Sequence, residues 1–105
     1  MFASVWQGKT TTENAPVYFK LLTEEILPRV ERENGACGTY IIQREVDGKV
    51  EFLAFILWES MELIRQFAGG NLEGLQIEPE ARALLVEHDE FVRHFELTHD
   101  SISGV

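Results

Sequence analysis

The architecture of this chain follows from one segment, Val50-Glu51-Phe52-Leu53-Ala54-Phe55-Ile56-Leu57-Trp58-Glu59-Ser60. Its seven apolar residues from Phe52 to Trp58 are rich in aromatic and branched side chains, and so short a run favours a strand over a helix. Successive side chains of a strand point to opposite faces of the sheet. One face would carry Phe52, Ala54, Ile56 and Trp58, and the other Leu53, Phe55 and Leu57. Exposing the second set would forfeit about 1.5–3 kcal/mol for each side chain, so both faces need a cover.

The dipeptide Asp47-Gly48 precedes this strand and predicts a tight hairpin turn, because both central positions of such a turn need positive φ. The partner strand is then Thr39–Arg44, paired antiparallel. An antiparallel sheet with one solvent-exposed face alternates apolar and polar residues, and the run from Phe52 to Trp58 does not alternate. The hairpin therefore predicts a sheet that is covered on both sides.

The chain has 105 residues, a net charge of −9 at pH 7 and 45% hydrophobic residues. This size and composition predict one domain, placed at residues 1–98, with a polar C-terminal tail at 99–105. The negative charge disfavours nucleic acid and anionic membrane surfaces as partners, because both need basic patches. No apolar run reaches the ~20 residues of a membrane span, the N-terminus lacks a signal-peptide layout, and the lone Cys37 excludes an internal disulfide. We expect a soluble cytoplasmic protein.

Helical spacing predicts a first helix from Ala15 to Val30, which Pro28 kinks or loosens in its final turn. Asn14 or Thr12 can cap its start. A second helix begins after Ser60, a plausible N-cap, and ends at Gly69-Gly70. A third, short helix begins at Pro79.

Two further strands complete the pattern, a first at Phe2–Gln7 that Gly8 ends and a last at Phe91–Leu97. The order β-α-β-β-α-(α)-β is that of an α+β, ferredoxin-like sandwich, in which helices cover one face of a four-stranded antiparallel sheet. The other face is still apolar, and the economical cover is a second copy of the chain. We expect a homodimer through this open sheet face; a monomer with a deep crevice there is the alternative.

The sequence resembles the antibiotic biosynthesis monooxygenase family of small dimeric α/β-barrel proteins. The matching residues are Trp6-Gln7-Gly8, Tyr18, Gly35, Gly38, the run from Phe52 to Trp58-Glu59-Ser60, Phe67-Ala68-Gly69, Pro79-Glu80, Leu84-Leu85 and His94-Phe95-Glu96. The resemblance implies a dimer with a pocket between sheet and helices in each protomer. It also implies either oxygenation of aromatic polyketides without metal or flavin, or the binding and degradation of haem.

The chain departs from both kinds of member. Haem degraders of this family carry a tryptophan and, further on, an iron-ligating histidine, and those positions fall near Phe67 and Ile77 here. The polyketide oxygenases place an asparagine four residues before the strand-ending tryptophan; Trp58 matches that tryptophan, but Ala54 replaces the asparagine. Haem degradation is therefore the less expected activity.

Aromatic residues are the candidates for binding a small apolar or aromatic ligand. Trp58 can stack on a planar substrate, and Trp6 and Phe67 can line the pocket with apolar surface. Tyr18 can donate a phenolic hydrogen bond to the ligand. The alternative for these residues is an ordinary place in the apolar core. Each buried indole also needs a partner for its single N–H.

His94 is the candidate catalytic residue. Its imidazole titrates near neutrality and could take a proton from an acidic phenol, leaving an anion that reacts with O₂. The alternative is a structural histidine in the sheet or at the dimer contact. His88, Glu90 and His94 do not match the spacing of a standard metal site, so we expect no metal and no other cofactor.

Two classes of function remain open from the sequence. The first is a cofactor-independent monooxygenase that acts on a small phenol- or quinone-type compound. The second is a non-catalytic dimer, for ligand binding or structure, in which the same aromatic residues fill the core. A ligand-sized cavity with a titratable group directed into it would separate the two.

Overall fold

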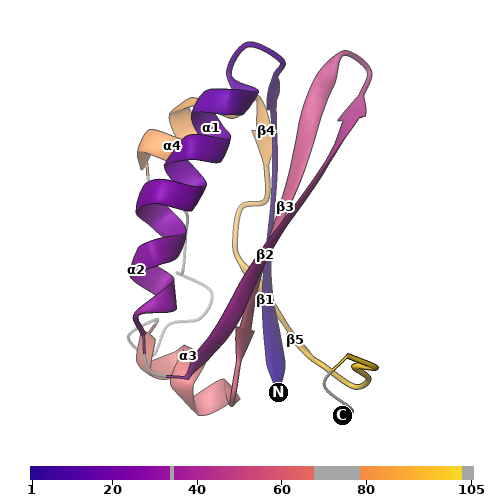
Figure 1. Ribbon diagram of the computed structural model, residues 1–105. Helices are drawn as coiled ribbons and strands as arrows, with labels where there is room; N and C mark the ends of the chain where they lie inside the picture. Colours follow the sequence, from indigo (N-terminus) through magenta and orange to yellow (C-terminus); the bar gives the residue numbers. More distant parts are fainter. Residues whose placement is uncertain (34, 68–78, 103–105) are drawn as a thin grey trace.

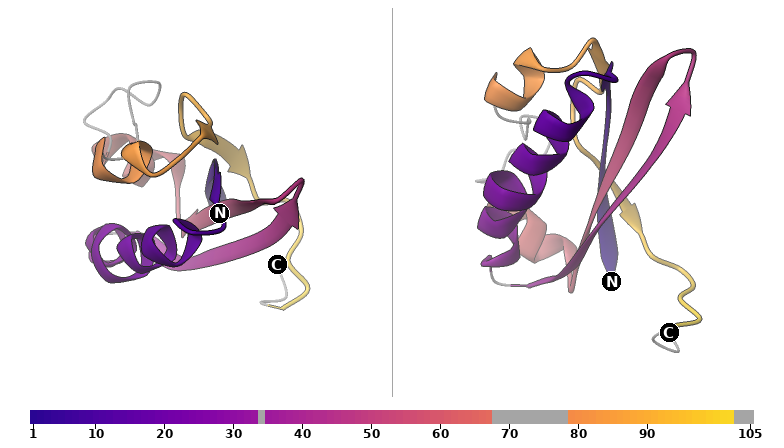
Figure 2. Two further views of the ribbon diagram at one scale, coloured as in Figure 1. Left: turned by 90° about the horizontal axis from the view of Figure 1, so that it is seen from above. Right: turned by 45° about the horizontal axis from the view of Figure 1, so that its top comes forward.

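The fold is one antiparallel sheet, and the helices of the described residues all lie on the same face of it, as the views in Figures 1 and 2 show. The computed structural model describes residues 1–33, 35–67 and 79–102. The strand order is β2 (Ala36–Val46), β3 (Lys49–Trp58), β1 (Phe2–Thr11) and β4 (Glu87–His88), and β5 (Arg93–Glu96) also pairs with β1. The predicted α+β, ferredoxin-like architecture is confirmed. None of the helices in the described part of the chain is long and apolar enough to cross a membrane.

The predicted hairpin joins β2 (Ala36–Val46) to β3 (Lys49–Trp58). Asp47 and Gly48 have φ values of 52° and 75°, so both central residues of the turn adopt the left-handed conformation. On the face toward the helices, Phe52 and Trp58 are buried, whereas Phe55 on the opposite face is half-buried. The two sets of side chains predicted for this strand therefore lie on opposite faces.

The first strand does not end at Gly8, because β1 (Phe2–Thr11) continues through it. A Cβ at Gly8 would lie 3.0 Å from a methyl group of Leu85 and 3.1 Å from the hydroxyl of Tyr18. Glycine here permits close approach of other side chains to the strand rather than a turn. The prediction of a break was wrong because it considered backbone freedom and not packing.

The fourth position of the sheet holds two short strands instead of one. β4 (Glu87–His88) pairs with Gly8 and Lys9 of β1, and β5 (Arg93–Glu96) pairs with the start of β1. The predicted strand Phe91–Leu97 is therefore shorter, and β4 was not predicted.

The first helical segment comprises α1 (Ala15–Leu21), a π-helical turn η1 (Leu22–Ile26) and α2 (Leu27–Glu31). Figure 1 shows them as one continuous rod. Pro28 cannot donate to the carbonyl four residues back, and its ring would clash with that carbonyl in an α-helix. The wider turn before it, closed by a bond from the N–H of Leu27 to the carbonyl of Leu22, removes this conflict.

The other helices are α3 (Met61–Phe67) and α4 (Pro79–Ala83). Ser60 caps α3 as predicted, since its hydroxyl accepts the N–H of Leu63 at 3.3 Å. Asn14 occupies the N-cap of α1 but makes no capping bond through its side chain. The predicted helix end at Gly69-Gly70 lies outside the described residues.

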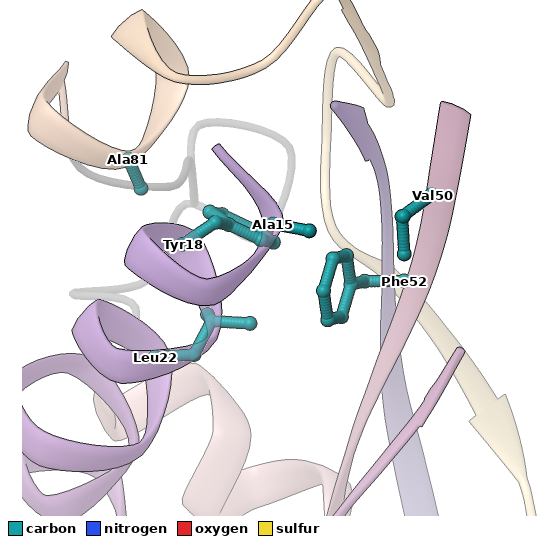
Figure 3. Packing of buried hydrophobic residues seen from close by; sticks show 6 residues of the cluster. All are labelled: Ala15, Tyr18, Leu22, Val50, Phe52 and Ala81. Atoms are coloured by element: carbon teal, nitrogen blue, oxygen red, sulfur yellow. The ribbon is translucent and has the colours of Figure 1, made fainter. Parts of the chain in front are cut away.

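Two apolar clusters hold the helices on the sheet. Figure 3 shows the first, in which side chains of α1, η1 and α4 face β3: Ala15, Tyr18, Leu22, Val50, Phe52 and Ala81. The second cluster lies toward the other end of β3 and contains Val30, Trp58 and Ile64.

Candidate functional site

A partly open cavity of about 90 Å³ lies between the helices and the covered face of the sheet. The described residues that line it are Ser4, Trp6, Leu22, Ile26, Leu27, Val30, Ala54, Ile56, Trp58, Phe67 and Val92. Almost all of these side chains are apolar. Small side chains open the space, because Ala54 is paired with Trp6 across β1 and β3 and leaves room beside the indole.

Both tryptophans of the sequence line this cavity, together with Phe67. The rings of Trp58 and Phe67 are 5.4 Å apart between centroids and tilted by 40°. Three of the four predicted ligand-binding residues are therefore brought together. Tyr18 is fully buried beside them, packed edge-on against Phe52, and does not line the cavity.

Ser4 connects the cavity to His94. Its hydroxyl lies 2.7 Å from Nδ1 of His94 and accepts a hydrogen bond from Nε1 of Trp58 at 3.1 Å. Ser4 is only 2% exposed and lines the cavity, whereas His94 lies behind it. The sheet sets this arrangement, because Ser4 and His94 are paired across β1 and β5 and Ser4 lies on the same face as Trp58.

The indole of Trp58 can only donate, so it fixes one lone pair of the Ser4 oxygen. When His94 is neutral with Nδ1 unprotonated, Ser4 donates its hydrogen to that nitrogen. When Nδ1 carries a proton, Ser4 accepts a second bond and its own hydrogen must point elsewhere. The protonation state of Nδ1 of His94 therefore decides whether the hydroxyl hydrogen of Ser4 is donated to His94 or is directed to another acceptor.

Ser4 was not found from the sequence. The available signal was weak: a single hydroxyl, two residues before Trp6 on the same face of an apolar strand. Its meaning depends on the pairing with His94, ninety positions later in the chain, which local periodicity does not contain. The indole of Trp58 has the polar partner that its burial required.

Trp6 and Tyr18 form a second polar feature. Both side chains are buried, and neither Nε1 of Trp6 nor the hydroxyl of Tyr18 has a hydrogen-bond partner in the described part of the chain. Burial raises the pKa of Tyr18 to about 12, and the neighbouring Trp6 N–H, which falls short of hydrogen-bond geometry, lowers it only in part.

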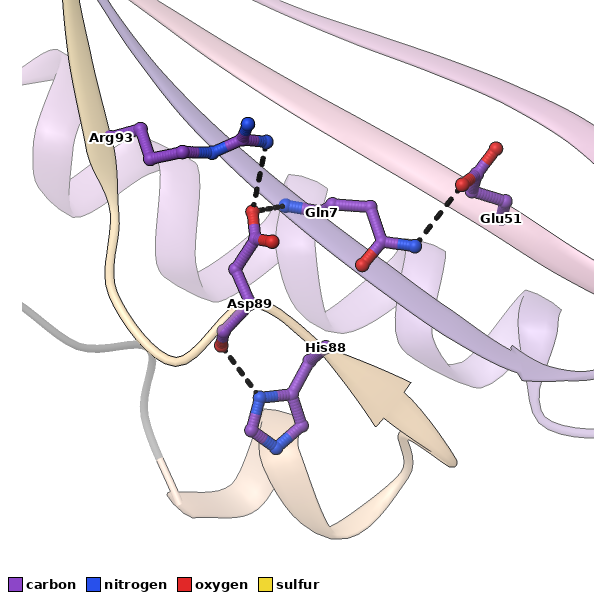
Figure 4. Close-up of polar contacts among 5 residues, drawn as sticks. All are labelled: Gln7, Glu51, His88, Asp89 and Arg93. Atoms are coloured by element: carbon purple, nitrogen blue, oxygen red, sulfur yellow. Dashed lines mark hydrogen bonds and ion pairs between the residues drawn. The ribbon is translucent and has the colours of Figure 1, made fainter.

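The outer side of Trp6 is covered by His88, whose ring stacks on the indole at 5.5 Å and 21°. The β4 strand and the residue after it are held by polar contacts drawn in Figure 4. His88 donates from Nδ1 to the carbonyl of Asp89 at 2.7 Å, and the carboxylate of Asp89 accepts from the N–H of Gln7 at 2.9 Å and from Arg93 at 3.2 Å. These bonds fix the wall of the cavity at Trp6.

His88, Glu90 and His94 are the residues whose types in the sequence suggest a metal site. Within residues 1–33, 35–67 and 79–102, no three His, Cys, Asp or Glu side chains lie close enough together to hold a metal ion. Ile77, at the position of the haem ligand, lies outside the described residues. His88 and His94 instead make the contacts described above.

Several solved structures of other proteins are similar in fold to this chain. No protein-family model matches the sequence, and no curated protein matches it. Two proposed antibiotic biosynthesis monooxygenases have similar structures, one from Bacillus cereus (15% identity, TM-score 0.67) and one from Deinococcus radiodurans (16% identity, TM-score 0.67). In both cases the match covers 95% of each chain. The chain has the antibiotic biosynthesis monooxygenase fold.

MhuD, the haem degrader of Mycobacterium tuberculosis, is also similar. A MhuD variant with two manganese protoporphyrin IX molecules bound per active site has 19% identity and a TM-score of 0.66, covering 95% of this chain and 97% of that one. The resemblance noted in the sequence is thus confirmed as a likeness in fold, and it extends over nearly the whole chain. At these identities it fixes the architecture and leaves the chemistry to the residues of the site.

Proposed function

We propose that the protein is a cofactor-independent monooxygenase that acts on a small phenol- or hydroquinone-type compound. The observation that supports this function best is the Ser4–His94 hydrogen bond at the wall of an apolar cavity lined by two indoles. Aromatic walls bind a flat ring by stacking and exclude water. A single polar relay in such a wall gives the ring's hydroxyl one place to bind and one group to accept its proton.

In this mechanism the substrate hydroxyl donates to Ser4, and Ser4 passes its own hydrogen to Nδ1 of His94. The resulting phenolate is electron-rich and reacts with O₂. For a hydroquinone, one oxygen atom enters the ring as a hydroxyl group and the other leaves as water. The ring becomes a hydroxyquinone and supplies all four electrons, so no external reductant is needed.

Haem degradation is the less favoured activity. Pockets for drug-sized ligands measure about 300–1,000 Å³, and the cavity here is about 90 Å³. The sequence has Phe67 and Ile77 at the positions where the resemblance would require tryptophan and an iron-ligating histidine. Isoleucine cannot ligate iron.

A non-catalytic ligand-binding or structural dimer is the second candidate, and the size of the cavity favours it. A dry cavity of roughly 150 Å³ is known to bind benzene, so a larger ring must reach out through the open side here. Turnover, rather than binding alone, therefore has to distinguish the two functions.

We also propose that a second copy of the chain covers the open face of the sheet. The exposed apolar side chains on this face include Tyr40, Ile42 and Phe95. The cations that border them, Lys9, Arg44 and Arg93, are each paired with a carboxylate of the same chain. A face with balanced charge can be buried against itself without leaving an unpaired ion.

The test is aerobic turnover of 1,4-dihydroxynaphthalene to its hydroxyquinone, measured by O₂ uptake and product absorbance after chelation and without added flavin. The assay uses a Cys37→Ser background, because the exposed thiol would add to the quinone. His94→Gln should lower the rate about 10²–10⁴-fold, the usual contribution of a general base. His99→Gln in the exposed tail is the matched control and should leave the rate unchanged.

Both variants must keep the parent's thermal stability for the comparison to hold. A His94→Gln variant that turns over at the parent rate would rule out His94 as the base. If the parent itself shows only the uncatalysed background while 1-naphthol quenches its tryptophan fluorescence, the protein binds without catalysis.

A further inference from the structure

Two buried hydrogen-bond donors on the covered face of the sheet lack a partner within the described residues. Nε1 of Trp6 can only donate, and Tyr18 has a hydroxyl hydrogen to donate. Trp6 is 5% exposed and Tyr18 is fully buried. Leaving a buried polar group unsatisfied is costly, so two neighbouring donors without an acceptor among the described residues indicate a missing acceptor.

The strand beneath them leaves space for the Tyr18 oxygen. Gly8 follows Trp6 on the same face of β1, and any Cβ there would lie 3.1 Å from the Tyr18 hydroxyl. Trp6 lines the cavity, and Leu22 belongs both to the cavity wall and to the cluster around Tyr18. Trp6 therefore brings one donor to the cavity wall and Tyr18 lies buried behind this wall toward Gly8, whereas Ser4 lies on the other side of Trp6 along the strand.

We propose that Trp6 and Tyr18 form a subsite for a neutral carbonyl oxygen of the ligand. A carbonyl oxygen has two lone pairs and can accept from both donors at once. A carboxylate fits poorly, because burying a charge without a cation is costly, and the paired cations Lys9, Arg44 and Arg93 lie on the opposite face or at its edge. The competing occupant is a single water molecule.

This subsite deepens the proposed function and rests on it only for the hydroxyl end of the ligand. Ser4 and Trp6 are two residues apart on one strand, so their Cα atoms are separated by roughly 7 Å. A ligand with a hydroxyl group at Ser4 and a carbonyl group toward Trp6 carries oxygen atoms at opposite ends of a ring system. The site thus selects hydroxyaryl ketones and the keto forms of hydroquinones over hydrocarbons of the same shape.

The test compares 1-indanone with indane, which has the same ring skeleton without the carbonyl. Both avoid the quinone chemistry that would modify Cys37. The sequence has only two tryptophans, so the indole region of a ¹H–¹⁵N spectrum contains one signal from Trp6 and one from Trp58. Indanone should shift the Trp6 signal downfield more than the Trp58 signal, which already has Ser4 as its acceptor. It should also bind about 10-fold more tightly than indane, the value of roughly one to two hydrogen bonds.

Tyr18→Phe removes one donor with little change of shape and should reduce the preference for indanone to about 3-fold or less. Tyr40→Phe, on the exposed edge of the other face, is the matched control and should keep the parent preference. Equal binding of indanone and indane by the parent protein would overturn the proposal. So would a Tyr18→Phe variant with the full preference, the result expected if water occupies the subsite.

Failure of this subsite is distinguishable from failure of the proposed function. His94→Gln should lower turnover of 1,4-dihydroxynaphthalene by the same factor of about 10²–10⁴ and keep the preference for indanone, because it alters the other end of the cavity. Tyr18→Phe should lose the preference even if the protein proves to have no catalytic activity. A preference for indanone that is lost in His94→Gln and kept in Tyr18→Phe would place the carbonyl at Ser4 and overturn the inference.

Discussion

The two faces of the sheet are formed by the same strands but carry different kinds of side chain. On the covered face, β1 and β3 alternate large rings with small residues such as Ser4, Gly8 and Ala54, and the helices close over them. On the open face, β3 presents Leu53 and Phe55 without any small residue between them. Small residues beside two indoles leave a cavity, whereas a row of large side chains leaves a continuous apolar surface.

Polar atoms also differ between the faces. The covered face has few, and they are placed singly: Ser4 bonds Trp58 and His94, and Trp6 and Tyr18 keep donors without partners in the described structure. The open face has ion pairs at its border, such as Arg44–Glu51. Isolated donors in an apolar wall are suited to a small ligand, and paired charges around an apolar centre are suited to another protein surface.

The largest expected effect on this comparison comes from Phe55→Asp, at the centre of the open face. Phe55 lies between Val5 and Tyr40 across the neighbouring strands, so a carboxylate there would be buried if a second chain covers the face. We expect the parent protein to sediment at twice the mass of one chain at micromolar concentration, and Phe55→Asp to weaken association by about 100-fold or more.

Val17→Asp is the control, because Val17 is an exposed apolar residue on the helical layer and should not affect association. A parent protein that sediments as a monomer would contradict the dimer. So would a Phe55→Asp variant that stays dimeric, because the open face would then not be the interface.

The sequence predicted the parts of the fold that depend on local pattern. The uninterrupted apolar run of β3 and the Asp47-Gly48 turn were sufficient for the hairpin and for the assignment of its two faces. Trp6, Trp58 and Phe67 were named from the sequence as separate candidates for ligand binding, and all three line one cavity. Gly8 was misread because its role is to admit Tyr18 and Leu85, which are distant in sequence.

The missing parts of the site depend on long-range pairing. Ser4 gains its role from His94 through the β1–β5 register. Such features follow from packing between elements, which the spacing of residues in one element does not contain.

An intermediate effect should be seen on the covered face at alkaline pH. Because the pKa of Tyr18 is raised from 10.0 to about 12, the unfolded chain loses this proton at lower pH than the folded chain. The folded state binds more protons between these values, so stability falls as pH rises through them, by at most about 2–3 kcal/mol. When the free energy of unfolding is measured in urea at a series of pH values, it should fall less steeply at alkaline pH for Tyr18→Phe than for the parent protein. Parallel limbs would mean that Tyr18 ionises normally and is not desolvated as the structure indicates.

The smallest expected effect on stability comes from the Arg44–Glu51 ion pair at the border of the open face. Hydrogen bonds from Arg44 first, and then from Gln7, hold the pKa of Glu51 below its usual value of 4.5. Glu51 therefore contributes stability above that pH and loses it as the pH falls toward its folded pKa. Arg44→Gln removes the larger cause and should make the acid limb of a urea-unfolding series, from about pH 6 to about pH 3, slightly shallower. Arg65→Gln, which breaks the exposed helical pair with Glu62, is the control and should leave the limb unchanged.

If a second chain covers this face, the Arg44→Gln effect should grow with protein concentration, because removing one partner of a pair costs more when the pair is buried. An effect that is the same at all concentrations would place Arg44 and Glu51 outside the interface.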